Sequence, residues 1–194
     1  MAKLYFNYST MNAGKTTVLL QAAHNYSERG MNPFLLTANA DTRSGIGTIK
    51  SRIGLKKSAQ IFSQSVDLLN KVKEANSKKS ISCVFVDEAQ FLTEQQVWQL
   101  AKVVDDLKIP VLCFGLRVDF QGNLFPGSKC LLSIADELKE VKTICHCGKK
   151  ATMVIRQLNG KTVVDGDQVQ IGGNESYTSL CRKHWLKEFE KARQ

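Results

Sequence analysis

The chain has 194 residues, of which 43% are hydrophobic and 23% charged, enough for one packed domain or for a domain with a small appended module. A net charge of +9, together with only 13 Gly and 3 Pro, excludes disordered, collagen-like and low-complexity chains. No apolar run reaches the roughly 18 to 20 residues of a bilayer span, and the N-terminus lacks a signal-peptide core, so we expect a cytoplasmic protein without membrane contact.

Basic side chains occur singly or in pairs rather than in blocks, and the aromatic residues are not interleaved with them. A stacking groove for nucleic acid would require that interleaving. The positive charge therefore predicts a solvated surface that suits phosphate-bearing small molecules, and we expect no direct nucleic-acid binding.

The first 38 residues predict a strand, a helix and a second strand. Residues 3–8 are apolar and aromatic, and apolar side chains recur every three or four positions over 16–29 before Gly30. Asn32 and Pro33 then turn the chain into an apolar run over 34–38. This βαβ order predicts a parallel sheet with a right-handed crossover.

The alternation of helices and strands continues along the chain. We expect a hairpin around 48–53, a helix over 66–75, a buried strand over 81–86 and a further strand over 110–115. Thr93 and Gln96 form a capping-box pattern that opens a helix ending at Leu107. The fold expected over residues 1–140 is α/β, a parallel sheet flanked by helices. A small zinc-ribbon domain is expected over 141–194, where Cys/His pairs and glycine turns begin.

The loop between the first strand and the first helix is similar to a phosphate-binding loop (P-loop). Its sequence matches G-x-x-x-x-G-K-[ST] except that Ser replaces the first glycine. In that pattern, backbone N–H groups and a helix N-terminus surround phosphate oxygens, the lysine reaches the β- and γ-phosphates, and the last hydroxyl binds Mg²⁺. The predicted ATP-binding residues of this loop are Ser9, Thr10, Met11, Asn12, Ala13, Gly14, Lys15 and Thr16.

An acidic pair follows the strand expected over 81–86. Asp87 stands where P-loop proteins place the carboxylate that holds Mg²⁺, so Thr16 and Asp87 form the predicted magnesium site. Glu88 beside it is then free to act as a general base toward a hydroxyl or a water. Phosphoryl transfer to a substrate and hydrolysis of ATP are both compatible with these residues.

Cysteine and histidine residues gather near the C-terminus. Cys145-His146-Cys147 and Cys181-x-x-His184 are two pairs separated by a loop, as in a structural zinc ribbon. We assign structural Zn²⁺ to Cys145, Cys147, Cys181 and His184, with His146 as an alternative nitrogen. Because a small ribbon has little core, we expect the metal to stabilise the loop between the two pairs.

Together these motifs resemble the cellular-type (type II) thymidine kinases, and the bacterial branch closely. The resemblance covers nearly the whole chain. It rests on S-T-M-N-A-G-K-T at 9–16, D-T-R at 41–43, F-V-D-E-A-Q-F at 85–91, G-L-R-V-D-F at 115–120, G-G-N-E-S-Y at 172–177 and the two zinc pairs. It implies phosphorylation of the 5′-hydroxyl of thymidine, and of deoxyuridine, by ATP with Mg²⁺ in deoxynucleoside salvage for DNA synthesis. It also implies a homotetramer that is feedback-inhibited by thymidine triphosphate.

The resemblance also implies roles for individual residues. Glu88 matches the family's catalytic base, and the ATP-binding set gains Asp87, Glu88, Ala89 and Gln90. The loop at 168–172 matches the family's lasso, which reads the thymine base mainly through backbone hydrogen bonds, and Phe120 would stack on that base. The implied nucleoside-binding residues are Met11, Phe91, Leu116, Phe120, Gln168, Val169, Gln170, Ile171, Gly172 and Tyr177. Asp41 and Arg43 match active-site positions of the family.

Two alternatives follow from the residues alone. A nucleic-acid-stimulated P-loop ATPase would use Glu88 to orient water and the basic zinc ribbon to bind DNA. A regulatory switch would bind ATP without consuming it. ADP formation that depends on a nucleoside, and not on single-stranded DNA, distinguishes the kinase from both.

Overall fold

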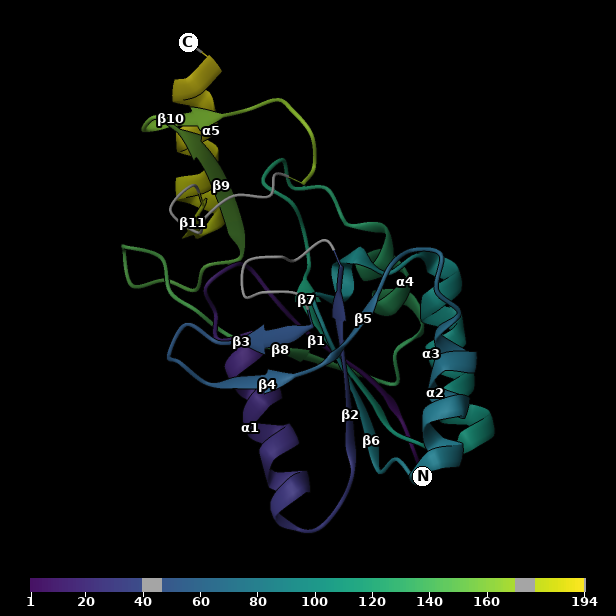
Figure 1. Ribbon diagram of the computed structural model, residues 1–194. Helices are drawn as coiled ribbons and strands as arrows, with labels where there is room; N and C mark the ends of the chain where they lie inside the picture. Colours follow the sequence, from purple (N-terminus) through teal and green to yellow (C-terminus); the bar gives the residue numbers. More distant parts are fainter. Residues whose placement is uncertain (40–46, 170–176, 194) are drawn as a thin grey trace.

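The computed structural model describes residues 1–39, 47–169 and 177–193. Within these residues six strands form a parallel sheet in the order β5–β2–β6–β7–β1–β8, with helices on both faces (Figure 1). The strands are β1 (Leu4–Ser9), β2 (Pro33–Ala38), β5 (Gln60–Phe62), β6 (Cys83–Asp87), β7 (Val111–Leu116) and β8 (Glu137–Glu140). The helices around them are α1 (Lys15–Glu28), α2 (Leu68–Lys78), α3 (Glu94–Leu107), α4 (Pro126–Ile134) and the short 3₁₀ helix η1 (Ala89–Phe91). The expected α/β fold with a parallel sheet is confirmed.

The central strand β6 is buried on both faces of the sheet, which explains its continuous apolar sequence. Cys83 and Phe85 point to one face and pack in the core beneath α1. Val84 and Val86 point to the other face and pack in the larger core beneath α2, α3 and α4. The sheet is thus covered by α1 on one side and by three helices on the other.

The helix ends follow their capping residues. α3 begins after the predicted capping box: Thr93 Oγ1 accepts from the Gln96 backbone N–H at 3.1 Å, and Gln96 Oε1 accepts from the Thr93 N–H at 3.1 Å. The helix predicted over 66–75 begins two residues later, at Leu68. It does so because the Asp67 carboxylate accepts the N–H of Asn70 at 2.9 Å and caps the helix there.

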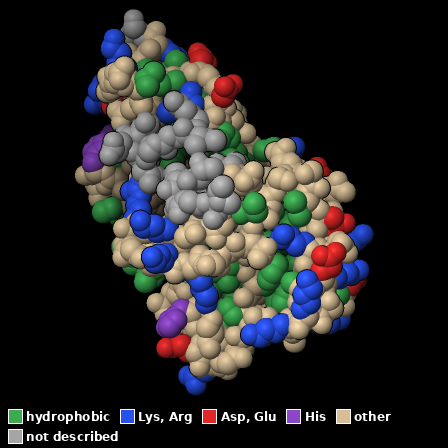
Figure 2. All heavy atoms as spheres, in the orientation of Figure 1, with side chains coloured by type: hydrophobic (Ala, Val, Ile, Leu, Met, Phe, Trp, Pro, Cys, Tyr) green, Lys and Arg blue, Asp and Glu red, His purple; other side chains and the backbone are tan. Residues whose placement is uncertain are grey.

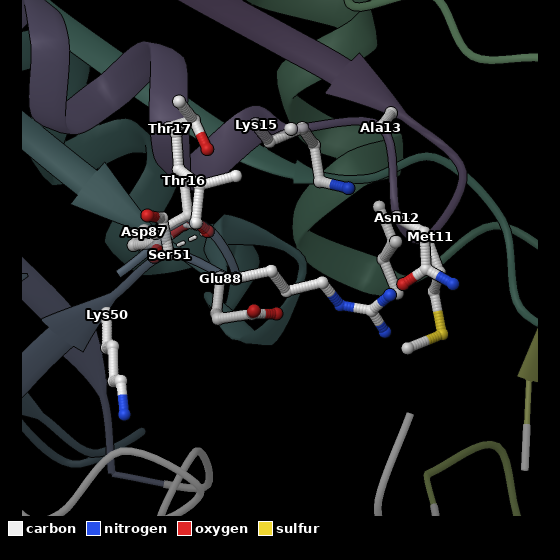
Figure 3. Close-up of a pocket in the computed structure, with 14 residues that line it drawn as sticks. Met11, Asn12, Ala13, Lys15, Thr16, Thr17, Lys50, Ser51, Asp87 and Glu88 are labelled. Carbon is white, nitrogen blue, oxygen red and sulfur yellow. Dashed lines mark hydrogen bonds between the residues drawn. The ribbon is translucent and has the colours of Figure 1, made fainter. Parts of the chain in front are cut away.

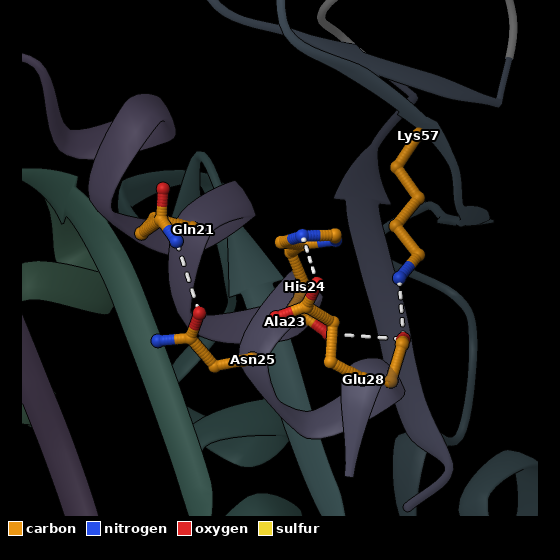
Figure 4. Close-up of polar contacts among 7 residues, drawn as sticks. Gln21, Ala23, His24, Asn25, Glu28 and Lys57 are labelled. Atoms are coloured by element: carbon orange, nitrogen blue, oxygen red, sulfur yellow. Dashed lines mark hydrogen bonds and ion pairs between the residues drawn. The ribbon is translucent and has the colours of Figure 1, made fainter. Parts of the chain in front are cut away.

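A two-stranded antiparallel hairpin, β3 (Thr48–Lys50) and β4 (Lys56–Ser58), lies beside α1. It extends beyond the predicted 48–53, because residues 51–55 form its turn. Ile49 is buried in the core under α1, and Lys57 Nζ donates to Ser27 Oγ of α1 at 2.8 Å (Figure 4). Figure 4 also shows His24 and Glu28 paired one helical turn apart, 3.2 Å between Nε2 and Oε1. The hairpin is therefore held against α1 by the buried Ile49 of β3 and by the hydrogen bond from Lys57 of β4.

The C-terminal part forms a separate three-stranded antiparallel sheet in the order β10–β9–β11. Its elements are β9 (Met153–Leu158), β10 (Lys161–Val163), β11 (Tyr177–Leu180) and α5 (Arg182–Arg193). α5 covers this sheet, and Trp185 Nε1 donates to the Phe120 carbonyl at 3.0 Å, which joins it to the loop after β7. Among the described residues, no helix has the length and apolarity that crossing a membrane requires.

Candidate active site

The phosphate loop connects β1 to α1 at the carboxyl edge of the parallel sheet. Gly14 stands before the first residue of α1 with φ +83°, a left-handed conformation that favours glycine. Lys15 Nζ donates to the Thr10 carbonyl at 2.8 Å, so the lysine folds back over the loop. The N-terminus of α1 opens at this loop, which is the arrangement in which helices bind phosphate.

A cleft of about 570 Å³ lies against this loop and is lined by residues 11–17, 50–53, 87–88 and 116. Figure 3 shows Thr16, Asp87 and Glu88 close together on one wall, with Ser51 of the hairpin beside them. The strands β1 and β6, which carry the loop and the acidic pair, are separated in the sheet by β7. The carboxyl ends of these three parallel strands therefore form one edge of the cleft.

Thr16 and Asp87, the predicted magnesium ligands, are in contact. Thr16 Oγ1 donates to Asp87 Oδ2 at 3.2 Å. Burial, and then the negative charge of Glu88, raise the pKa of Asp87 to about 7, although the backbone of Glu88, the Thr16 hydroxyl and Lys15 act in the opposite direction. A hydroxyl and a carboxylate suit a divalent cation, because oxygen ligands are those that Mg²⁺ prefers, and a cation there would offset the burial and repulsion that raise this pKa.

Glu88 has φ +54° and ψ 40°, a conformation that non-glycine residues seldom adopt. This conformation turns the chain from β6 into η1 and leaves Glu88 at the cleft wall. Behind it, Gln90 Nε2 donates to Glu88 Oε2 at 2.5 Å, and Gln90 Oε1 accepts the Leu116 backbone N–H at 3.0 Å. The carboxylate is thus held in one orientation by a residue that is only 2% exposed.

Two glycines allow neighbouring elements to approach η1. A Cβ on Gly115 would lie 2.9 Å from the backbone nitrogen of Gln90, and one on Gly127 would lie 2.7 Å from the Ala89 carbonyl oxygen. β7 and α4 therefore pack directly on the backbone behind Glu88. The sequence gives no sign of this role for either glycine, because nothing local to either position indicates the element that packs on it.

Four predicted ATP-binding residues support the cleft from behind rather than line it. Ala89 and Gln90 are buried in η1, and Ser9 and Thr10 are each 5% exposed. Ser9 Oγ donates to the Val141 carbonyl, and Thr10 Oγ1 donates to the Met153 carbonyl at 3.2 Å. The base of the phosphate loop is thereby joined to the C-terminal part of the chain.

The turn of the β3–β4 hairpin contributes residues that the sequence analysis did not select. Lys50, Ser51, Arg52 and Ile53 line the cleft opposite the phosphate loop. A basic residue in a glycine-bearing turn is common on protein surfaces, so the local pattern gives no signal for Arg52. Only the packing of the hairpin on α1 places its charge at this cleft.

Of the predicted nucleoside-binding residues outside the lasso region and Tyr177, two line the cleft and two aromatic residues do not. Met11 and Leu116 line the cleft, and Met11 also packs against the core of the C-terminal part. Phe91 meets Phe125 edge-on, with ring centroids 6.3 Å apart. Phe120 is 1% exposed and belongs to the core of the C-terminal part.

The lasso region is described only at its two ends. Gln168 Nε2 donates to Asp119 Oδ2 at 2.8 Å, Val169 is 40% exposed, and Tyr177 begins β11. The remaining predicted positions lie outside the described residues: Gln170, Ile171, Gly172, Asp41 and Arg43.

Four predicted zinc ligands come together. The candidate ligand atoms of Cys145, Cys147, Cys181 and His184 all lie within 4.8 Å of one another. His184 Nδ1 is 3.3 Å from Cys145 Sγ and 3.5 Å from Cys181 Sγ, and the Cys147 and Cys181 sulfurs are 3.9 Å apart. A tetrahedral ion with bonds of about 2.0 to 2.3 Å has edges of about 3.3 to 3.8 Å, so this cluster can hold a metal ion.

The electrostatics around Cys145 also suit a metal. Burial by itself raises the pKa of the Cys145 thiol, but backbone hydrogen bonds from Cys147 and Cys181 and one from His184 lower it to about 6. A thiolate is the form that binds metal. His146, the alternative nitrogen, stacks on His184 with ring centroids 4.3 Å apart and lies outside the four-residue group.

Comparison with known proteins decides the family. The family model described as Thymidine kinase matches residues 2–185. The thymidine kinase of Ruegeria pomeroyi is 64% identical over 186 residues, which is 95% of this chain and 94% of the relative. Those of Photobacterium profundum (58%, covering 95% and 97%) and Aliivibrio fischeri (55%, covering 98% and 100%) are also similar. The chain belongs to the thymidine kinase family.

A structural likeness adds nothing to this assignment. The helicase Pif1 from Candida albicans aligns with a TM-score of 0.43 at 14% identity, covering 74% of this chain and 36% of the helicase. So distant a likeness has no bearing on function.

Among the described residues, this member of the thymidine kinase family brings into one cleft the elements that phosphoryl transfer needs. Lys15 and the α1 N-terminus can bind phosphate, Thr16 and Asp87 can hold a cation, and Glu88 offers an oriented carboxylate. Lys and Arg side chains on the face shown in Figure 2 occur at several separate places rather than in one basic patch.

Proposed function

We propose that the enzyme transfers the γ-phosphate of ATP to the 5′-hydroxyl of thymidine. The 5′-oxygen bonds to the γ-phosphorus, the bond from that phosphorus to the β–γ bridging oxygen breaks, and ADP leaves with the electron pair. The hydroxyl proton passes to Glu88. The observation that supports this role is that the Glu88 carboxylate, held by Gln90, lines the same cleft as Lys15 and Thr16.

The triphosphate is bound by the chain's own donors. The backbone of the phosphate loop and the N-terminus of α1 surround the β- and γ-phosphates, and Lys15 adds a positive charge. Arg52 faces this loop across the cleft and supplies a second cation. Thr16 and Asp87 would hold Mg²⁺, which would supply charge neutralisation at the phosphates.

The nucleoside is bound between the cleft and the C-terminal part of the chain. Met11 belongs to both, since it lines the cleft and packs against the core that contains Phe120. The lasso at 168–172 and Tyr177 read the thymine base, and deoxyuridine is accepted because it differs from thymidine only by a methyl group. Phe91 and Leu116 complete the nucleoside site.

Zn²⁺ is the metal we propose for the four-residue cluster, because three thiolates and one imidazole at tetrahedral spacing match a closed structural zinc site. Cys145, Cys147, Cys181 and His184 would hold the ion in a domain of residues 141–194, which begins after β8 ends the parallel sheet at Glu140. The role of this domain is to position the lasso over the nucleoside.

Membership of the family supports three further properties. The enzyme is a cytoplasmic homotetramer, it acts in deoxynucleoside salvage for DNA synthesis, and thymidine triphosphate inhibits it. Light scattering measures the assembly, and titration of thymidine triphosphate into the kinase assay measures the inhibition. A monomeric enzyme at full activity, or unchanged turnover at saturating inhibitor, would contradict these properties.

The decisive experiment follows ADP formation from Mg-ATP with thymidine, deoxyuridine, deoxycytidine, deoxyadenosine or uridine. Turnover confined to thymidine and deoxyuridine, with a 5′-monophosphate product, is the expected result. Glu88→Gln should bind both substrates and lose about 10²- to 10⁴-fold in kcat, the usual contribution of a general base. ADP formation that responds to single-stranded DNA and to no nucleoside would instead favour an ATPase.

A further inference from the structure

Arg156, in the middle strand of the C-terminal sheet, is a buried charge with uncharged partners. It is 5% exposed, and its guanidinium carbon lies 4.0 Å from the centroid of the Phe120 ring. Nη1 donates to the Asp167 carbonyl at 2.8 Å and Nη2 to the Asp165 carbonyl at 3.4 Å. Nε is buried and has no hydrogen-bond partner among the described residues. One side chain therefore contacts both an aromatic ring and the backbone of the segment 165–168.

Gly166 is fitted to this arginine. It has φ +133°, and a Cβ added there would lie 2.5 Å from Arg156 Nη2. Any other residue at 166 would both strain the backbone and displace the guanidinium. The absence of a side chain at this position is thus what allows the two flanking carbonyls to accept from Arg156.

A second contact fixes the same segment. Gln168 Nε2 donates to Oδ2 of Asp119, a carboxylate that is 3% exposed. Oδ1 of Asp119 accepts the backbone N–H groups of Gln121 and Asn123 at 2.9 and 2.8 Å. The segment 165–168 is therefore joined to the loop that carries Phe120 directly through Gln168 and indirectly through Arg156.

The chemistry of arginine suits this position better than that of any apolar residue. A buried charge costs free energy, and well-packed apolar side chains usually serve stability as well or better. Arginine alone presents a flat face that stacks on a ring together with N–H donors in its plane that reach two carbonyls. The arrangement fixes the position of the Phe120 ring relative to the segment 165–168 and does more than fill space.

We propose that Arg156 is a positioning residue for the nucleoside site, which sets the Phe120 ring and the segment leading into the lasso relative to each other. This inference rests on the proposed function, in which the lasso reads the thymine base and Met11, which packs against the core that contains Phe120, joins the cleft to the C-terminal part. Arg156 acts on thymidine binding through the Phe120 ring and this segment and leaves the ATP site, which lies on the other side of Met11, unaffected.

The test compares Arg156→Met and Arg156→Lys with Lys161→Met, an exposed cation on the neighbouring strand β10. Loss of charged hydrogen bonds should raise the thymidine Kd and KM about 10-fold or more in Arg156→Met, while the KM for ATP stays within about twofold. Lysine keeps the charge over the ring but not the paired donors, so Arg156→Lys should fall between the two. Lys161→Met should match the wild type.

A double-mutant cycle isolates the contact with Gly166. Gly166→Ala should raise the thymidine Kd about 10-fold in the wild type and clearly less in an Arg156→Ala background, where the clash is gone and only the backbone strain at 166 remains. Additive effects, or parallel losses in kcat and melting temperature without a selective change in thymidine Kd, would overturn the inference. Calorimetric binding keeps the two proposals separate: a wild type that binds thymidine without phosphorylating it refutes only the proposed function.

Discussion

Gln90 donates a hydrogen bond of 2.5 Å to the carboxylate of Glu88 while its own carbonyl oxygen accepts the Leu116 backbone N–H at 3.0 Å. The second bond fixes which end of the amide faces Glu88, because a flipped amide would place its NH₂ group against another donor. The position of η1 relative to β7 therefore determines, through the buried Gln90 amide, how the Glu88 carboxylate is oriented. General-base catalysis depends on such orientation, since the base must lie within hydrogen-bond reach of the proton it takes.

Replacing the amide should reduce turnover without reducing nucleotide binding. Gln90→Met has nearly the same shape but donates no hydrogen bond, so we expect kcat to fall about 10- to 100-fold with the KM for ATP within about twofold. Gln95→Met, at an exposed position of α3, is the matched control. Equal kcat values for both variants would show that Glu88 is oriented without Gln90.

The sequence predicts the buried part of this fold well. β6 and β7 are continuous apolar runs because both faces of the sheet are covered, and the Thr93 and Gln96 pair is a capping box in the structure as in the pattern. These signals are local: each depends on burial or on atoms within four residues. The phosphate loop and each of the two metal-ligand pairs are local in the same sense.

Elements whose stability depends on distant contacts were not predicted. β8 reads Glu-Leu-Lys-Glu and is an edge strand, where polar residues are common and no alternating pattern appears. α4 is short, opens with Pro126 and contains Gly127, whose fit against the Ala89 carbonyl no local pattern indicates. In the site, Gln90 was expected to bind ATP, and its role behind Glu88 depends on a hydrogen bond to Leu116, 26 residues away. Arg52 reaches the cleft from the hairpin, an element unrelated to the phosphate loop.

The buried carboxylate of Asp87 should destabilise the protein in the absence of magnesium. Its pKa is about 7 in the folded state, above the ordinary value of 3.8, so between these pH values the folded chain binds more protons than the unfolded chain. The free energy of unfolding therefore falls as the pH rises from about 4 to about 7. Asp87→Asn removes this penalty and should raise the free energy of unfolding at pH 8 by about 1 kcal/mol or more, while abolishing Mg-dependent activity.

Thermal melts without added magnesium test this expectation. The gain in melting temperature of Asp87→Asn should be largest at pH 8 and shrink toward pH 5, and Asp106→Asn, on the exposed face of α3, should show neither effect. A variant that melts below the wild type at pH 8 would mean that the hydrogen bond from Thr16 contributes more than the buried charge costs.

Arg52 should contribute to catalysis through its charge. It lines the cleft opposite Lys15, where negative charge collects on the transferring phosphoryl oxygens. Arg52→Gln should lower kcat/KM for ATP about 10- to 100-fold, with the melting temperature unchanged because the side chain is exposed. Lys56→Gln removes an exposed charge from the next strand of the same hairpin and serves as the control. Equal losses in both variants would point to the net charge of the hairpin rather than to a contact with phosphate.

Removal of the metal should weaken the binding of thymidine more than the binding of ATP. The four ligands lie in the C-terminal part, whose core includes Cys145, Cys181 and Phe120, whereas the phosphate loop is supported by the parallel sheet. Chelation, or Cys181→Ser, should lower the melting temperature and raise the KM for thymidine about 10-fold or more, with a smaller change in the KM for ATP. Cys130→Ser replaces a buried thiol of the parallel-sheet core and should keep its zinc. A fully active protein that contains no zinc by elemental analysis would contradict both the metal assignment and its link to the nucleoside site.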